Sequence, residues 1–135
     1  MAVRHPDDLT HTMTVPGNAT ITTDAVVPLV RITRPGVVNS VEFLANAAQS
    51  GADTHSRTFR LYNRGQAGAG TALVASLALT SGVDLAAYVA KAITLGAAAD
   101  RVVAVGDVLV WDSLHVGNGI LDAGGLVIVQ QSLGT

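Results

Sequence analysis

The stretch DVLVWDSLHV, residues 107–116, predicts the strongest β-strand of this 135-residue chain. Valine, leucine and tryptophan fill its centre, and β-branched and aromatic residues favour extended backbone. A glycine-rich loop follows at 117–125, and valine, isoleucine and glutamine then alternate along Leu126–Gln131, as in a strand with one buried face. The last quarter of the chain therefore predicts two strands joined by a loop.

Similar short runs of apolar and β-branched residues continue back to residue 19. Turn residues separate them, among them Arg34-Pro35-Gly36 and the sequence GQAGAG at 65–70. The expected strands, besides the two above, are 19–23, 26–33, 37–45, 57–63, 71–79 and 90–95. About eight strands at nearly even spacing predict an all-β fold, an antiparallel, jelly-roll-like β-sandwich.

Two alanine-rich segments leave room for helices. Leu44–Gln49 and Leu85–Ala92 could each form a short helix, and Gly82–Tyr88 could hold a single helical turn. Neither alanine-rich segment is long enough to cross over a parallel sheet, as a βαβ unit requires. The β-sandwich therefore remains the expected architecture.

Residues 1–18 differ from the rest of the chain. They are polar, contain Pro6 and Pro16, and include two of the four histidines. We expect an extended N-terminal arm over 1–18, with at most one short strand near Thr12–Val15. The β-sandwich domain is then expected over 19–135.

The composition argues against several classes of protein. The chain has no cysteine, which excludes disulfides and thiolate metal sites, and its eight basic residues are scattered, which argues against a nucleic-acid partner. No apolar run approaches the roughly 20 residues that span a membrane, and the N-terminus lacks the apolar core of a secretory signal. With 49% hydrophobic but only 13% charged residues, the chain is expected to cover surface by oligomerising or by docking on a larger assembly.

Catalytic and metal-binding motifs do not emerge from the sequence. There is no G-x-S-x-G motif, the four histidines lack metal-ligand spacing, and Glu42 is the only glutamate. Ser113 and His115 share one face of the expected strand, but we interpret them as polar residues on a solvent or subunit face. The expectation is a protein that is not an enzyme and binds no cofactor or metal.

Trp111 is the only tryptophan and lies in the middle of the strongest strand. A lone tryptophan at such a position favours the core. The alternative is an interface anchor, because tryptophan is enriched where subunits meet. Trp111 and His115 are therefore the candidate subunit-interface residues.

Three segments resemble a known group of proteins. They are GDVLVWDSLHVGNGILDAGGLVIV at 106–129, RTFRLYNRG at 57–65 and GTALVASLALTSGVDLAAY at 70–88. They resemble small structural proteins encoded in the head-gene region of tailed phages of actinobacteria, which are similar to capsid decoration, or cement, proteins. The resemblance covers roughly residues 24–130 and implies no catalytic residues.

The resemblance implies a virion protein on the capsid exterior that binds the lattice of the major capsid protein and stabilises the head, as a homotrimer. The N-terminal arm would then be a clamp on the shell, and deleting residues 1–17 should weaken shell binding without unfolding the sandwich. The candidate capsid-contacting residues of the arm are Arg4, His5, Asp7, Asp8 and His11.

Two other functions remain open. A tail- or fibre-type adhesion module that binds a host surface glycan would need exposed aromatic side chains that stack on sugars. The chain has only five aromatic residues, and most of them occupy core-like positions. An enzyme on a jelly-roll scaffold would need a clustered histidine and glutamate metal set, which the sequence lacks.

Overall fold

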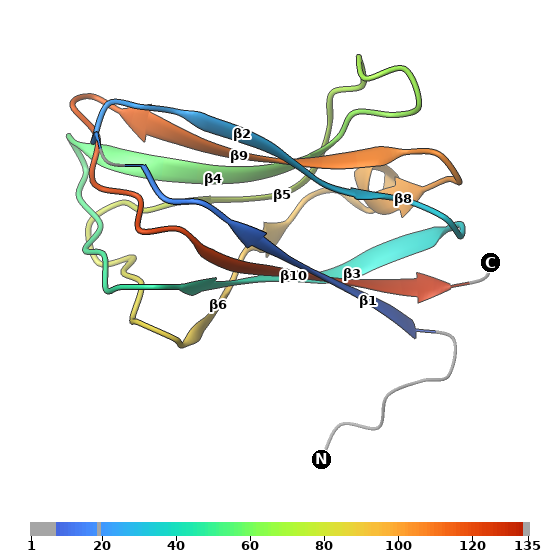
Figure 1. Ribbon diagram of the computed structural model, residues 1–135, viewed down its shortest axis with the longest axis horizontal. Coiled ribbons are helices and arrows are strands. Elements are labelled where there is room, and N and C mark those ends of the chain that lie inside the picture. Colours follow the sequence, from blue (N-terminus) through green and yellow to red (C-terminus); the bar gives the residue numbers. More distant parts are fainter. Residues whose placement is uncertain (1–7, 19, 134–135) are drawn as a thin grey trace.

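The computed structural model describes residues 8–18 and 20–133, which form two antiparallel β-sheets packed face to face (Figure 1). The described residues contain ten strands and one short 3-10 helix, η1. In chain order they are β1 (Asp8–Val15), β2 (Ala25–Arg31), β3 (Gly36–Ala45), β4 (Ser56–Asn63), β5 (Ala72–Ala78), β6 (Ala90–Ala92), β7 (Thr94–Leu95), η1 (Ala98–Arg101), β8 (Val102–Val103), β9 (Val108–Val116) and β10 (Gly125–Leu133). The all-β sandwich expected from the sequence is confirmed.

The strand order is that of a jelly roll. One sheet has the order β1-β10-β3-β6, with the two-residue strand β8 also on β3, and the other has the order β2-β9-β4-β5-β7. The first long strand therefore lies beside the last, and the second beside the one before last, as in a double-sheet jelly roll. Every strand pair is antiparallel, and bulges interrupt the register of β10 with β3, β2 with β9, and β4 with β5.

Three aromatic side chains lie at the centre of the core. Phe43, Phe59 and Trp111 come from three different strands, and their ring centroids are 5.0 to 5.5 Å apart. Trp111 is only 1% exposed. The core interpretation of this tryptophan is therefore correct, and its assignment as a subunit-interface residue is wrong, because a side chain enclosed between the sheets cannot reach a second copy.

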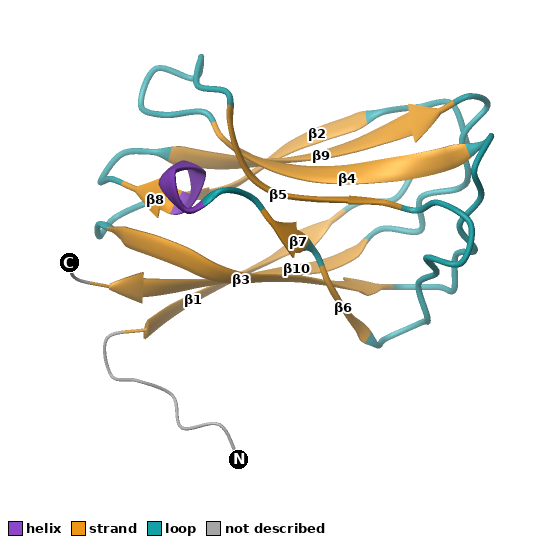
Figure 2. Cartoon of the chain, turned by 180° about the vertical axis from the view of Figure 1, so that it is seen from behind, coloured by secondary structure: helices purple, strands orange, loops and turns teal. Residues whose placement is uncertain are grey.

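The two long sides of the sandwich differ. On the side shown in Figure 2, the chain passes directly from β6 in one sheet to β7 in the other. Ile93 sits at this crossing, is 2% exposed, and its backbone N–H donates to the carbonyl oxygen of Val41 at 2.8 Å. On the opposite side, β1 and β2 leave an apolar crevice of about 130 Å³, which His11, Met13, Leu29, Val30, Val127 and Val129 line.

The N-terminal part of the fold differs from the expectation. Strand β1 pairs with β10 along its whole length, from Asp8 opposite Ser132 to Val15 opposite Gly125, and Val15 is 3% exposed. Among the described residues the sandwich therefore already includes Asp8, and does not start at residue 19. Leu9, His11, Met13 and Val15 alternate toward the core, a strand pattern that the two flanking prolines obscured.

Smaller differences concern the loops and short elements. The segment expected as a strand at 19–23 contains a turn instead, closed by the backbone hydrogen bond from Thr23 to the carbonyl of Thr20. Neither alanine-rich segment is helical, and the strand expected at 90–95 is divided between the two sheets at Ile93. Strand β8 and helix η1 were not anticipated. Within the described residues, no helix has the length and hydrophobicity needed to cross a membrane.

Candidate interaction surfaces

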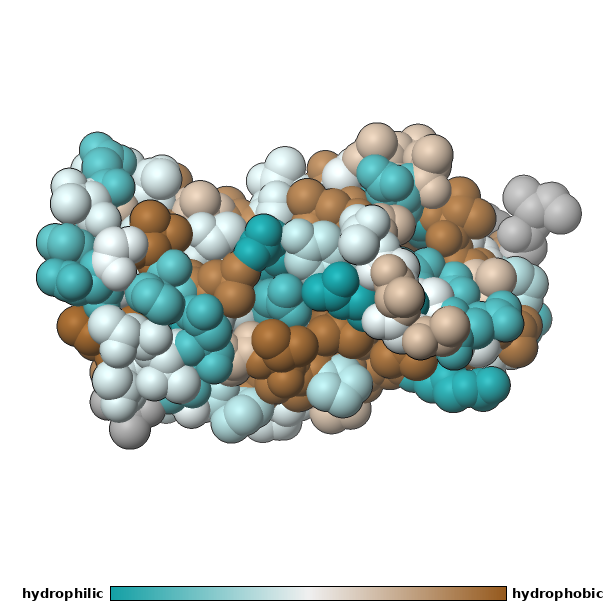
Figure 3. All heavy atoms as spheres, turned by 90° about the horizontal axis from the view of Figure 1, so that it is seen from above, coloured by the Kyte–Doolittle hydropathy of each residue, from teal (hydrophilic) through white to brown (hydrophobic). Residues whose placement is uncertain are grey.

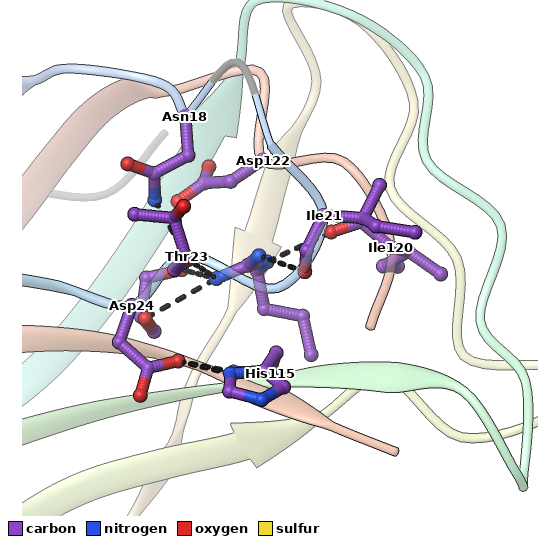
Figure 4. Close-up of polar contacts among 9 residues, drawn as sticks. Asn18, Ile21, Thr23, Asp24, His115, Ile120 and Asp122 are labelled. Atoms are coloured by element: carbon purple, nitrogen blue, oxygen red, sulfur yellow. Dashed lines mark hydrogen bonds and ion pairs between the residues drawn. The ribbon is translucent and has the colours of Figure 1, made fainter. Parts of the chain in front are cut away.

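A buried arginine holds together the loops at one end of the sandwich. Arg57, near the start of β4, is 0% exposed. Its guanidinium donates hydrogen bonds of 2.9 to 3.2 Å to the carbonyl oxygens of Ile21, Thr23, Ser113 and Ile120 and to the hydroxyl of Ser113. Figure 4 shows Ile21, Thr23 and Ile120 gathered close together, with dashed lines marking the hydrogen bonds between the residues drawn. The β1–β2 and β9–β10 loops are thus tied to one side chain.

Ser113 connects this arginine to a buried carboxylate. The Ser113 hydroxyl accepts from Arg57 Nη1 at 3.1 Å and donates to Asp122 Oδ2 at 2.7 Å. The other oxygen of Asp122 accepts the backbone N–H of Gly124 at 2.9 Å. Ser113 is 1% exposed and fully engaged, and it makes no hydrogen bond with His115, its neighbour on the same strand face. The structure therefore assigns Ser113 a structural role.

His115 pairs with Asp24 at the surface of this end (Figure 4). Asp24 Oδ1 lies 2.6 Å from His115 Nδ1 and accepts the backbone N–H of His115 at 2.8 Å. These bonds, the backbone one first, lower the pKa of Asp24 below 3.8. The His115 side chain is 33% exposed, so it can reach a partner, and its subunit-interface role remains a prediction. No local pattern pointed to Asp24, which lies 91 positions from His115 along the chain.

The other predicted site residues do not form one site. Arg4, His5 and Asp7 lie outside the described residues, whereas Asp8 and His11 belong to β1. The ring Nε2 of His11 lies 3.0 Å from the side-chain oxygen of Gln131 on the neighbouring strand β10. Within residues 8–18 and 20–133, no three histidine, aspartate or glutamate side chains gather as a metal site would require.

An apolar groove of about 270 Å³ also opens at the loop end. Its walls are Ala47, Ala48, Gln49, Ser50, Ile120, Leu121 and Ala123. Gln49 fixes its shape, because its side-chain amide donates to the carbonyl of Leu121 and its side-chain oxygen accepts the backbone N–H of Ala123. Leu121 is 51% exposed at the rim. This groove is a preformed surface that could accept an aliphatic side chain of a partner.

The outer faces of the two sheets have different chemistry. On the outer face of the β1-β10-β3-β6 sheet, hydroxyl and aliphatic residues prevail, and Glu42 is the charged residue near the centre. The residues of this face include Thr12, Thr14, Leu44, Leu126 and Ile128. On the other sheet, Arg60, Tyr62, Arg64 and Asp112 occupy the middle. Figure 3 looks onto this second face and shows hydrophilic residues in the middle with hydrophobic residues on either side.

Asp112 is the unusual member of the charged face. It is 5% exposed although it alternates with the core residues Trp111 and Ser113, and its Oδ1 has no hydrogen-bond partner among the described residues. Its Oδ2 lies 3.7 Å from Arg64 Nη2. Burial raises the pKa of Asp112 above 3.8, against the opposing effect of Arg64 and Arg60.

Replacing Asp112 by asparagine is expected to leave the free energy of unfolding at pH 7 equal or higher. The raised folded-state pKa means that the ionised carboxylate destabilises the folded chain at pH above that pKa, and the disadvantage disappears as the group is protonated. The gain should therefore shrink as the pH falls through the raised pKa toward 3.8, the unfolded value. Urea unfolding of both proteins at pH 7 and near pH 3.5 measures the difference. A less stable variant at pH 7 would mean that the two arginines outweigh burial.

Many large hydrophobic side chains are exposed. Among the described residues there are nine: Met13, Ile21, Val26, Tyr88, Val89, Val102, Val105, Val116 and Leu121. Tyr88 is 76% exposed and has a φ of 62°. It is the one non-glycine residue with a positive φ among residues 8–18 and 20–133. A tyrosine in this left-handed backbone conformation is strained, and such strain often marks a functional position.

Comparison with known proteins adds little. No protein-family model and no curated protein matches the chain. One similar solved structure is that of infectious bursal disease virus, Gx strain, with 12% sequence identity and a TM-score of 0.44 over 95% of this chain and 33% of that chain. This chain thus spans about a third of the viral chain, and a likeness of this extent carries no argument about function.

Proposed function

We propose that this chain is a structural protein of a phage virion, a capsid decoration protein that binds the outer surface of the major capsid protein lattice and stabilises the head. In this proposal it acts as a homotrimer, without catalytic chemistry, cofactor, nucleic acid or membrane. The observation that carries the proposal is the set of nine exposed large hydrophobic side chains among the described residues of a small jelly-roll sandwich.

These hydrophobic residues are spread over both ends and both sides of the sandwich, from Met13 on β1 to Val102 on β8. A monomer gains nothing from exposing them, whereas a subunit that is enclosed by copies of itself and by a lattice covers them. Many identical weak contacts across a shell add up to strong retention, so each copy needs only a modest interface. The resemblance of residues 24–130 to decoration proteins supports the same function.

The test is addition of the purified protein to empty shells of the parent phage. We expect binding that saturates at a fixed number of copies per shell, and shells that resist heating better after binding, because a ligand that binds only the intact lattice stabilises it. Light scattering on heating and sedimentation of the complex measure both effects. Shells that neither bind the protein nor gain heat resistance would overturn the proposal.

A second candidate function follows from Tyr88. An aromatic ring that is 76% exposed can stack on a sugar, which is what an adhesion module for a host surface glycan needs. This function predicts that the protein binds host wall polysaccharide and that Tyr88→Ala abolishes the binding. Retention of the protein on host cell walls, with no binding to shells, would favour it over the decoration function.

A further inference from the structure

The charged face of the β2-β9-β4-β5 sheet is a compact arrangement. The strand register places Arg60 opposite Asp112 and Tyr62 opposite Val110. Arg64 follows directly after β4, and Arg31, at the end of β2, lies opposite Val108 on the same face. Asp24, whose charge also acts on Asp112, precedes β2 at the other end of this face. Three guanidiniums against two carboxylates leave an excess of one positive charge, although the whole chain has a net charge of −2.

Two of these guanidiniums are held in place. The Cζ atom of Arg64 lies 4.4 Å from the centroid of the Tyr62 ring, and that of Arg60 lies 5.6 Å from it. Arg64 also donates from Nη1 to the carbonyl oxygen of Gly70 at 3.1 Å. Stacking on an aromatic ring lowers the entropy that a long side chain loses on binding, so both groups are prepared to meet a partner.

Arg60 is not satisfied by the residues that the structure describes, and Arg64 is satisfied only in part. Arg60 makes neither a hydrogen bond nor an ion pair with any described residue, and its Nε is buried without an acceptor. The contact between Arg64 and Asp112 is long, at 3.7 Å. A half-buried guanidinium without an acceptor costs free energy, and a carboxylate from outside would satisfy it with short, paired hydrogen bonds.

We propose that this face is the surface by which the protein docks on an acidic surface of the shell protein, with a partner carboxylate bound by Arg60 and Arg64. This inference rests on the proposed function for the identity of the partner. The argument is charge complementarity, because the face carries more positive than negative charge and Arg60 has no carboxylate of its own among the described residues.

The surroundings favour a protein over other polyanions. Val26, which is 62% exposed, lies opposite Asp112 on the neighbouring strand. Aliphatic residues beside the charges suit a protein surface, whereas nucleic acid would require a longer track of cations. A sugar would require an open aromatic ring, and the Tyr62 ring already has Arg64 over it.

The experiment compares Arg60→Gln and Arg64→Gln with Arg34→Gln, a matched loss of one charge in the β2–β3 loop. Arg34 is exposed, and its carbonyl oxygen accepts a hydrogen bond from Gln131 of the other sheet. Each variant is titrated into empty shells and, separately, into poly-L-glutamate, with double-stranded DNA as a third probe. We expect the first two variants to bind shells and polyglutamate at least about tenfold more weakly, and Arg34→Gln to bind like the native protein. Native binding should weaken as salt is added.

The outcomes separate the two proposals. Equal binding of shells by all variants would overturn the acidic docking face and leave the decoration function standing. No binding of shells by the native protein would overturn the decoration function. The polyglutamate titration would then show by itself whether Arg60 and Arg64 bind carboxylates. If the native protein binds DNA and not polyglutamate, and Arg60→Gln loses that binding, the proposal that the partner is a protein is wrong.

A variant that fails to fold would be recognised by urea unfolding, and Asp112→Asn then provides the second test. It keeps both guanidiniums, removes the carboxylate that competes for them, and is expected to bind polyglutamate at least as tightly as the native protein. Weaker binding by Asp112→Asn would contradict the assignment.

Discussion

Replacing Arg57 by alanine is expected to lower the free energy of unfolding by about 3–5 kcal/mol, the cost of breaking a buried charged network. The substitution leaves the carbonyl oxygens of Ile21 and Ile120 without a donor, and leaves that of Thr23 with only the 3.3 Å bond from the Asn18 side-chain amide. Ile21 and Thr23 belong to the β1–β2 loop and Ile120 to the β9–β10 loop, so we expect both loops to loosen near Arg57, although Asp24 stays bonded to His115 and Asp122 to Ser113. Urea unfolding measures the loss of stability, and amide exchange in residues 20–24 and 117–124 locates it.

Two further variants make this prediction specific. Arg57→Lys keeps the charge but lacks the planar group that serves several acceptors at once, so it should recover only part of the loss. Arg34→Ala, on an exposed loop, should change the stability by less than about 0.5 kcal/mol. If Arg57→Ala is as stable as Arg34→Ala, the loops are held by something other than this side chain.

Deleting residues 1–17 is expected to abolish the folded state. The deletion removes β1 and with it eight residues paired to β10, including the buried Val15. It uncovers Val127 and Val129, which are 1% exposed, and turns β10 into an unprotected edge that can pair with other chains. Circular dichroism and size-exclusion chromatography should show unfolded or aggregated protein. This result differs from the expectation that the sandwich survives the deletion.

The matched control is deletion of residues 2–7, which leaves every described strand complete. This shorter protein should unfold at nearly the same urea concentration as the native chain. It also tests the clamp separately, because any loss of shell binding would then come from the deleted residues and not from unfolding. A folded 18–135 protein would show that β1 contributes little to the sandwich.

Much of the fold follows from local patterns. Alternation along Arg57–Asn63 and the apolar run around Trp111 predict strands with a buried face, and the structure has them as β4 and β9. The same alternation places Arg57 in phase with Phe59 and Leu61, which was a sign that this arginine points inward. A buried arginine requires several hydrogen-bond acceptors. Those of Arg57 lie in two loops that are far from it in the sequence, so no local pattern identifies them.

The parts that were missed depend on contacts between distant segments. The pairing of β1 with β10 joins residues about 120 positions apart, and the polar appearance of Asp8–Thr14 hides it because threonine and histidine occupy an edge strand. Asp24 and Asp122 are single residues in loops, and their partners His115 and Ser113 become evident only in three dimensions. Residues 90–95 are divided between the two sheets because Ile93 is buried where the chain crosses from one to the other, and this position is evident only in three dimensions.

The pairing of β1 with β10 also determines how the molecule responds to force. Asp8 lies opposite Ser132, so the two ends of the described chain emerge together at one end of the sandwich, away from the loops that Arg57 ties (Figure 1). A pull on both ends would therefore load the hydrogen bonds of this strand pair one after another, as in a zipper, instead of all at once in shear. The domain should open at low tension when stretched by its ends, and anything fused to either end would leave the Arg57 loops uncovered.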